Sequence, residues 1–206
     1  MAEFAVEFDT RLPDVVVDEI IKLGHDYPVK DGAVFRPDGE VQHISTQRDS
    51  LVSYIPTDVW IGPMLWYWIQ AANRRNFRYN ITSYDTEMIQ YTEYNEGQFY
   101  HWHPDQHLYT EYTPNLVPSS KYNHASNESF VEHEYVRKLA FSLQLSGPDD
   151  YDGGELQFLD AGKLMTAPKA RGRMIVFDAR TMHRVRKVKS GCRKSLVGWI
   201  VGPRWS

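Results

Sequence analysis

Two segments in the N-terminal part of the chain carry apolar residues at helical spacing. Residues 14–23 (DVVVDEIIKL) follow Pro13 and begin with an aspartate, which predicts a short amphipathic helix that ends at Gly24. Residues 58–73 carry a stripe of large apolar side chains, with Pro63 in the first turn, where proline is tolerated. We interpret the members of this stripe as core-packing residues: Trp60, Met64, Leu65, Trp68 and Ile69.

From about residue 80 the pattern changes to short runs typical of strands, separated by turn residues. The C-terminal half contains no segment with helical periodicity, which disfavours a parallel sheet with crossover helices and favours an antiparallel jelly roll. We therefore expect a mainly β fold with N-terminal packing helices. The predicted strands are residues 87–94, 137–146, 154–160, 173–179, 183–188 and 193–202.

The size and composition of the chain are those of a folded protein. Its 206 residues, 42% hydrophobic and 24% charged, fit one domain, residues 1–206, with helical support over about 1–80 and a jelly-roll core over about 81–206. A net charge of -4 gives no electrostatic reason to expect nucleic acid. The single cysteine, the lack of a secretory pattern and the lack of a long apolar run predict a cytoplasmic protein without a membrane anchor.

Potential metal ligands are concentrated between residues 100 and 107 (YHWHPDQH). In an extended chain, residues two apart face the same side, so His101, His103, Asp105 and His107 can share one face, although a metal needs only two of them. His183, which follows the predicted strand 173–179, is a candidate third ligand. Two histidines and one carboxylate form the facial triad of non-haem Fe(II) oxygenases, which leaves coordination positions open. A structural zinc site is instead closed by four protein ligands.

Arg193 lies in a predicted hydrophobic strand. Strand periodicity puts Arg193, Ser195, Val197 and Trp199 on one face. A buried guanidinium needs an anion, and its planar fork suits bidentate binding of a carboxylate. That carboxylate is either an internal aspartate or glutamate or part of a ligand.

Several of these residues match a known pattern at once. Residues 94–105 fit Tyr-x-x-Gly-x-x-Tyr-x-x-His-x-Asp at every defined position. The further matches are residues 152–156 (DGGEL), His183-x-Val185, Gly191-x-Arg193-x-Ser195 and Trp199. Over roughly residues 85–203 the chain thus resembles the prolyl 4-hydroxylase-like branch of the Fe(II)/2-oxoglutarate dioxygenases, including the bacterial PKHD-type hydroxylases.

The resemblance implies a cupin-like jelly roll, the double-stranded β-helix, with a bound iron. The implied iron ligands are His103, Asp105 and His183. It also implies that Arg193 holds the distal carboxylate of 2-oxoglutarate, with hydroxyl hydrogen bonds from Tyr94 and Ser195. The implied activity uses O2 and couples decarboxylation of 2-oxoglutarate to succinate and CO2 with hydroxylation of a C–H bond. Ascorbate, which maintains Fe(II), is named as a requirement for many PKHD-type relatives.

The substrate stays open at this point. Collagen-type and plant-type prolyl 4-hydroxylases usually carry lysine where this chain has Arg193, whereas PKHD-type relatives commonly carry arginine. A peptidyl proline, another amino-acid side chain and a small molecule are therefore all candidate substrates, and we hypothesise that residues 106–134 form a lid over them. The alternatives to the dioxygenase are a cupin-like metalloprotein that uses His101, His103 and His183, and a catalytically silent jelly-roll binding module.

Overall fold

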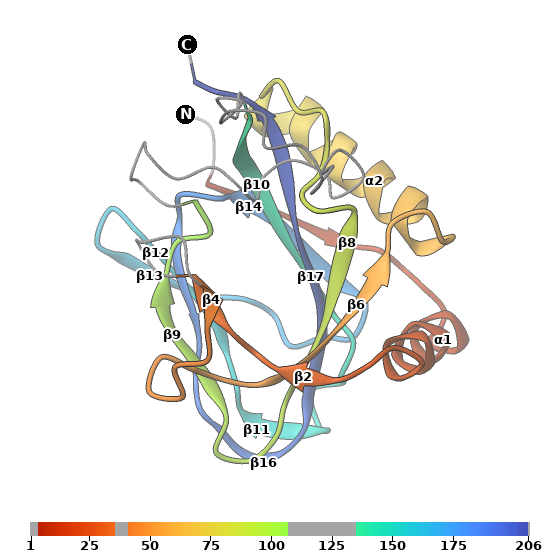
Figure 1. The fold of residues 1–206 in the computed structure, drawn as a ribbon, viewed down its shortest axis with the longest axis vertical. Helices are drawn as coiled ribbons and strands as arrows, with labels where there is room; N and C mark the ends of the chain where they lie inside the picture. Colours follow the sequence, from red (N-terminus) through yellow and green to blue (C-terminus); the bar gives the residue numbers. More distant parts are fainter. Residues whose placement is uncertain (1–3, 36–40, 107–134, 206) are drawn as a thin grey trace, which may run out of the picture.

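The computed structural model describes residues 4–35, 41–106 and 135–205, so the predicted lid lies outside the described residues apart from Gln106. Two antiparallel sheets face each other, and two helices cover the outer face of the larger sheet (Figure 1). The mainly β, jelly-roll architecture predicted from the sequence is thereby confirmed. Within the described ranges, no helix is both long and apolar enough to cross a membrane.

The larger sheet includes strands from both ends of the chain. Its strands, in spatial order, are β1 (Ala5–Asp9), β14 (Arg173–Asp178), β10 (Tyr135–Gln144), β17 (Arg193–Pro203), β8 (Met88–Tyr94), β6 (Leu51–Pro56) and β2 (Lys30–Asp31), and β7 (Ser83–Tyr84) also pairs with β17. The N-terminal part of the chain therefore contributes strands to this sheet as well as helices.

The smaller sheet carries the strand that ends at His103. Its strands, in spatial order, are β13 (Lys163–Thr166), β12 (Leu156–Asp160), β15 (Met182–Val185), β9 (Phe99–His103) and β5 (Arg48–Asp49). The predicted strand 183–188 is divided, because β15 pairs with β12 and β9 whereas β16 (Val188–Gly191) pairs with β11 (Tyr151–Gly153). A separate hairpin joins β3 (Val34–Phe35) to β4 (Val41–Gln42).

The two helices pack through their apolar faces. Helix α1 (Asp14–His25) buries Val17 and Ile20, and it continues through Gly24, where the sequence predicted its end. The reason is close packing, because a Cβ at Gly24 would lie 2.4 Å from Cγ of Tyr91.

Helix α2 (Ile61–Ala72) continues into a π-helical segment, Asn73–Phe77. Leu65 and Ile69 are fully buried, in agreement with the predicted stripe. The prediction was wrong for Trp60, which is 46% exposed because it precedes the first helical residue.

The larger sheet separates two apolar cores. Leu196 and Ile200 of β17 face the helices, while Ala140, Phe177 and Phe158 belong to the core between the sheets. The intervening positions of β17, from Arg193 to Trp199, line a pocket between the sheets, as strand periodicity predicted. The functional candidates thus lie inside the jelly roll, opposite the helical layer.

Candidate active site

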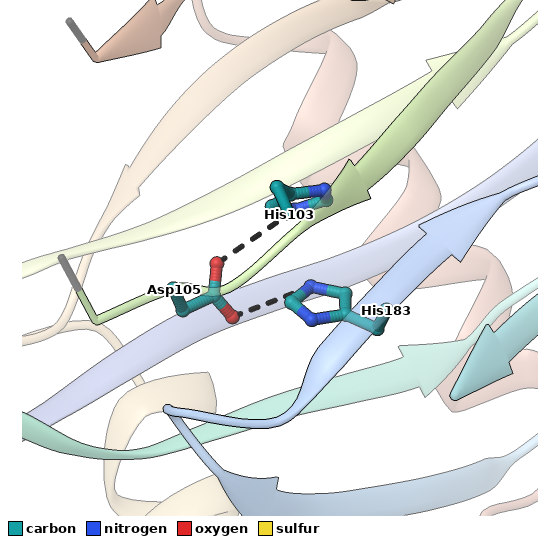
Figure 2. Close-up of side chains that lie close together, drawn as sticks. All are labelled: His103, Asp105 and His183. Carbon is teal, nitrogen blue, oxygen red and sulfur yellow. Dashed lines mark ion pairs between the residues drawn. The ribbon is translucent and has the colours of Figure 1, made fainter. Parts of the chain in front are cut away.

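Three candidate metal ligands come together because β9 and β15 are neighbours in the smaller sheet. His103 ends β9, and the register of the antiparallel pair sets it opposite His183 on β15. Asp105 follows Pro104 two residues later. One potential ligand atom from each of the three lies within 4.8 Å of the others, and all three side chains point to one place (Figure 2). The Asp105 carboxylate lies 3.9 Å from Nε2 of His103 and 3.5 Å from Nε2 of His183.

Backbone carbonyl groups fix the orientation of both imidazole rings. Nδ1 of His103 lies 2.7 Å from the carbonyl oxygen of His101, and Nδ1 of His183 lies 3.0 Å from that of Thr181. A carbonyl oxygen only accepts hydrogen bonds, so each Nδ1 carries the proton. Nε2 is then the nitrogen of each ring that can bind a metal, and the Nδ1 contact is the type of outer interaction that orients metal-bound histidines.

Asp105 is held through its backbone. The amide groups of Asp105 and Gln106 both donate to the carbonyl oxygen of Ala179, at 2.9 and 2.8 Å. From the other side, Nη1 of Arg137 donates to the carbonyl oxygen of Asp105 at 3.3 Å. The carboxylate therefore projects from a fixed segment, although Asp105 lies beyond the end of β9.

Aromatic rings enclose the three ligands. The Tyr100 ring stacks on His103 with 3.5 Å between ring centroids, and the Phe177 ring lies 4.9 Å from His183. Burial raises the pKa of Tyr100 to about 12, although the nearby charge of Arg48 opposes the shift. Tyr100 therefore contributes a neutral ring at physiological pH. The rings give the cavity apolar walls beside the candidate ligands, which suits chemistry at a metal.

The pocket extends from the ligands to Arg193 at its deep end. Its empty volume is about 490 Å³ including the mouth. The residues that line it are Arg48, Gln90, Tyr94, Tyr100, His103, Asp105, Phe141, Ser142, Leu156, Phe177, His183, Val185, Arg193, Ser195, Val197 and Trp199. All six residues that the sequence singled out for metal and co-substrate binding therefore share one cavity.

Arg193 is 2% exposed, and no carboxylate in the described part of the chain forms an ion pair with it. Its Nη1 donates to Oγ of Ser195 at 3.1 Å, and its buried Nε has no hydrogen-bond partner within the described ranges. A buried guanidinium without a counter-ion is costly, so this part of the pocket is suited to a ligand that carries an anionic group. The internal aspartate or glutamate considered from the sequence is not found among the described residues.

Tyr94 lies directly across the strand pair from Arg193, in register on β8. Burial raises the pKa of Tyr94, and the positive charges of Arg48 and Arg193 oppose this rise. The phenol is therefore neutral at physiological pH and can donate a hydrogen bond to an anion. The guanidinium carbon of Arg193 lies 5.7 Å from the centre of the Tyr94 ring.

His101 is not part of the ligand cluster found among the described residues. His101 is exposed, and its ring packs edge-on against Phe99 at 4.8 Å between centroids. Its contribution to the site is its backbone carbonyl oxygen, which accepts the hydrogen bond from Nδ1 of His103. The cupin-like ligand set with His101 therefore does not form among the described residues, and His107 lies outside them.

Two residues in or beside the cavity were not found from the sequence. Arg48, 5% exposed, donates to Oγ of Ser50 and to the carbonyl oxygen of Ala33. It lies in a short polar stretch without periodicity, so no sequence signal marked it. Tyr151 lines a small cavity that adjoins the pocket and shares Arg193 with it. Its only signal was its position two residues before the Gly153-Gly154 turn.

Comparisons with known proteins agree with this arrangement. A model of the 2OG-Fe(II) oxygenase superfamily matches residues 89–201, which include all of the ligands. A PKHD-type hydroxylase of Parvibaculum lavamentivorans is 37% identical over 94 residues, 45% of this chain and 40% of that relative. A PKHD-type hydroxylase of Hyphomonas neptunium is 42% identical over 62 residues, 30% of this chain and 28% of that relative. The match thus spans less than half the length of either relative.

Solved structures share the fold at low sequence identity. A prolyl-4-hydroxylase from Pseudomonas putida superposes with a TM-score of 0.64 at 18% identity, covering 98% of this chain and 93% of that one. A prolyl hydroxylase from Trichoplax adhaerens, in complex with a peptide fragment of hypoxia inducible factor, gives a TM-score of 0.67 at 15% identity, covering 96% and 83%.

Proposed function

Because the chain belongs to the 2OG-Fe(II) oxygenase superfamily, we propose that it hydroxylates a C–H bond of its substrate in a reaction coupled to decarboxylation of 2-oxoglutarate. One observation carries the proposal. A cluster of two histidines and one carboxylate shares a buried pocket with an arginine that has no counter-ion among the described residues.

The donor set fits Fe(II). His103 and His183 would bind through Nε2, the nitrogen that the carbonyl contacts leave for a metal, and Asp105 would bind through its carboxylate. Three protein ligands leave positions for a co-substrate and O2. The bound iron and 2-oxoglutarate supply the oxidising chemistry, and the protein supplies coordination, orientation and exclusion of water.

The deep end of the pocket would hold the distal carboxylate of 2-oxoglutarate. Arg193 offers its positive charge and an Nε–H that has no partner among the described residues. Its Nη1 donates a hydrogen bond to Oγ of Ser195, which helps to fix the guanidinium. Tyr94, opposite in the sheet, offers a neutral hydroxyl. An oriented, charged donor set of this kind recognises a carboxylate more strongly than neutral groups do.

We place the substrate among protein side chains, with peptidyl proline as one candidate. Support comes from the structural neighbours, several of which are prolyl hydroxylases, one of them in complex with a peptide. Trp199 and Val197 line the pocket beside the ligands and offer an apolar surface to such a side chain.

The first test is an anaerobic titration of the metal-free protein with Fe(II) and then 2-oxoglutarate, followed by visible absorption. Chelation of the iron by the 2-oxo acid gives a weak charge-transfer band. We expect a band in the wild type that Asp105→Ala abolishes and Arg193→Ala weakens. A folded protein that binds iron but shows no band would overturn the proposal and favour a silent binding module.

A further inference from the structure

The structure brings a tyrosine that no sequence motif marked to a small cavity that adjoins the ligand pocket and shares Arg193 with it. Tyr151, on β11, is 6% exposed and lines the cavity together with Gln144 and Arg193. Its backbone is fixed because β11 pairs with β16 and sets Tyr151 opposite Gly191. The ring has Gly154 on one side, where an added Cβ would come within 3.0 Å of Cε2 of Tyr151. Its position is therefore closely defined.

The hydrogen bonds of Gln144 determine which way the Tyr151 hydroxyl points. Nε2 of Gln144 lies 3.1 Å from the carbonyl oxygen of Ser146 and 3.1 Å from the hydroxyl oxygen of Tyr151. The Ser146 carbonyl can only accept, so the atom of Gln144 that faces it must be the nitrogen. That nitrogen then donates its second hydrogen to Tyr151, whose oxygen accepts.

Arg193 approaches the same hydroxyl, and it too can only donate. Burial raises the pKa of Tyr151, while the charge of Arg193 and hydrogen bonds from Arg193 and Gln144 oppose the rise. Both neighbouring groups are donors only, so neither the Gln144 nitrogen nor the Arg193 guanidinium can accept the hydroxyl hydrogen of Tyr151. This hydrogen must point elsewhere, and no described residue supplies an acceptor for it. The neighbouring Nε of Arg193 likewise has no partner in the structure.

We propose that Tyr151 donates its hydroxyl hydrogen to the distal carboxylate of 2-oxoglutarate and so completes the co-substrate site with Arg193. This inference rests on the proposed function and adds a binding residue to it. An O–H donor and an N–H donor that converge without an acceptor form a site for a carboxylate. Gln144 acts through Tyr151, because its amide prevents the phenol from turning its hydrogen towards the protein.

The test compares two 2-oxo acids that differ in the distal carboxylate. Mn(II)-loaded wild type and Tyr151→Phe are titrated calorimetrically with 2-oxoglutarate and with pyruvate, which lacks that group. We expect Tyr151→Phe to weaken 2-oxoglutarate binding about tenfold, the typical effect of losing a hydrogen bond to a charged group, and to leave pyruvate binding unchanged. Tyr67→Phe, on the exposed face of α2, is the matched control and should bind both acids like the wild type.

The outcomes separate this inference from the function on which it rests. A wild type with no metal-dependent affinity for 2-oxoglutarate would overturn the proposed function. Normal binding in the wild type with equal binding in Tyr151→Phe would overturn the role of Tyr151 alone, as would an equal loss for both acids. If Tyr151→Phe does not fold, Gln144→Leu replaces it, and we expect a smaller loss that is again restricted to 2-oxoglutarate.

Discussion

Arg137 and Asp85 form a buried ion pair, with 2.6 Å between Nη2 of Arg137 and Oδ2 of Asp85. The same guanidinium donates to the carbonyl oxygen of Asp105 and lies 4.2 Å from the centre of the Trp199 ring. The pair therefore connects the candidate carboxylate ligand to the larger sheet across the pocket. Neither Arg137 nor Asp85 belongs to the candidate ligand set.

Removing the charge of Asp85 should destabilise the fold strongly. Asp85 is fully buried, and Asp85→Asn breaks its buried ion pair with Arg137 by removing one charge, which typically costs about 3–5 kcal/mol. Urea denaturation of the metal-free protein measures this loss. Arg173→Gln, which breaks the exposed contact with Glu7, is the control and should cost less than about 1 kcal/mol. Equal effects of the two changes would contradict the account of the pair.

Substitution of His183 should lower the metal affinity strongly, whereas substitution of His101 should change it little. His183→Ala removes a ligand, so the loss of Mn(II) affinity should exceed the roughly 10- to 100-fold that changes to outer partners of metal ligands cause. His101→Ala should change the affinity little, because His103 uses the His101 carbonyl oxygen, which alanine retains. Calorimetric titration with Mn(II) measures both, and a large loss in His101→Ala would restore the cupin-like ligand set.

Gly154 should tolerate alanine less well than Gly162 does. Both glycines have positive φ, +61° and +80°, so alanine is strained at either position by about 1–2 kcal/mol. At Gly154 the new Cβ would also come within 3.0 Å of Tyr151 and Val188, whereas nothing lies within 4 Å at Gly162. Thermal unfolding should therefore show a larger loss for Gly154→Ala, and only this variant should bind 2-oxoglutarate more weakly. Identical melting temperatures would show that the Tyr151 ring has room to move.

Glu93 should contribute to stability in a pH-dependent way. Burial raises its pKa, but hydrogen bonds from His25 and Tyr91 and the charge of Lys194 outweigh burial and bring the pKa below its ordinary value. A lowered folded-state pKa means that the carboxylate stabilises the fold above about pH 4.3, the ordinary glutamate pKa, and that this stabilisation is lost as the pH falls through the folded-state value.

We therefore expect Glu93→Gln to be less stable than the wild type near neutral pH and to show a weaker loss of stability in acid. Urea unfolding across about pH 3 to pH 7 measures the difference. Glu96→Gln, at an exposed position nearby, is the control and should follow the wild type. If the free energy of unfolding of Glu93→Gln depended on pH as that of the wild type does, the contacts of this carboxylate would not contribute to stability.

The sequence predicted those features that depend on local pattern. Alternation along β17 identified the face of Arg193 and Ser195. Spacing alone left four candidate ligands between residues 101 and 107, and the resemblance to the family pattern selected His103 and Asp105 among them. Strand β1 was not predicted. It is a five-residue edge strand, and its extended structure depends on pairing with the distant strand β14.

Features that depend on tertiary contacts were not visible in the sequence. Gly24 looked like a helix terminator, and only the approach of the Tyr91 ring explains why it lies inside α1. Tyr151 and Arg48 reach the pocket from strands whose partners are far away in sequence, so no spacing rule could have placed them beside Arg193 or Tyr100. The candidate metal ligands were accessible to sequence reasoning because they belong to a motif with fixed spacings, whereas Tyr151 and Arg48 match no defined position of that motif.

The pairing of β9 with β15 brings together two ligands, His103 and His183, that are far apart along the chain. An ion bound to both residues would link two positions that are far apart along the chain. The complete set of candidate ligands is assembled only in the folded state, when the sheet has formed. Occupancy would therefore stabilise the folded chain by mass action, by about 2.7 kcal/mol when the free ion is at one hundred times its Kd. Iron supply would then govern the lifetime of the protein against unfolding and proteolysis as well as its turnover of substrate.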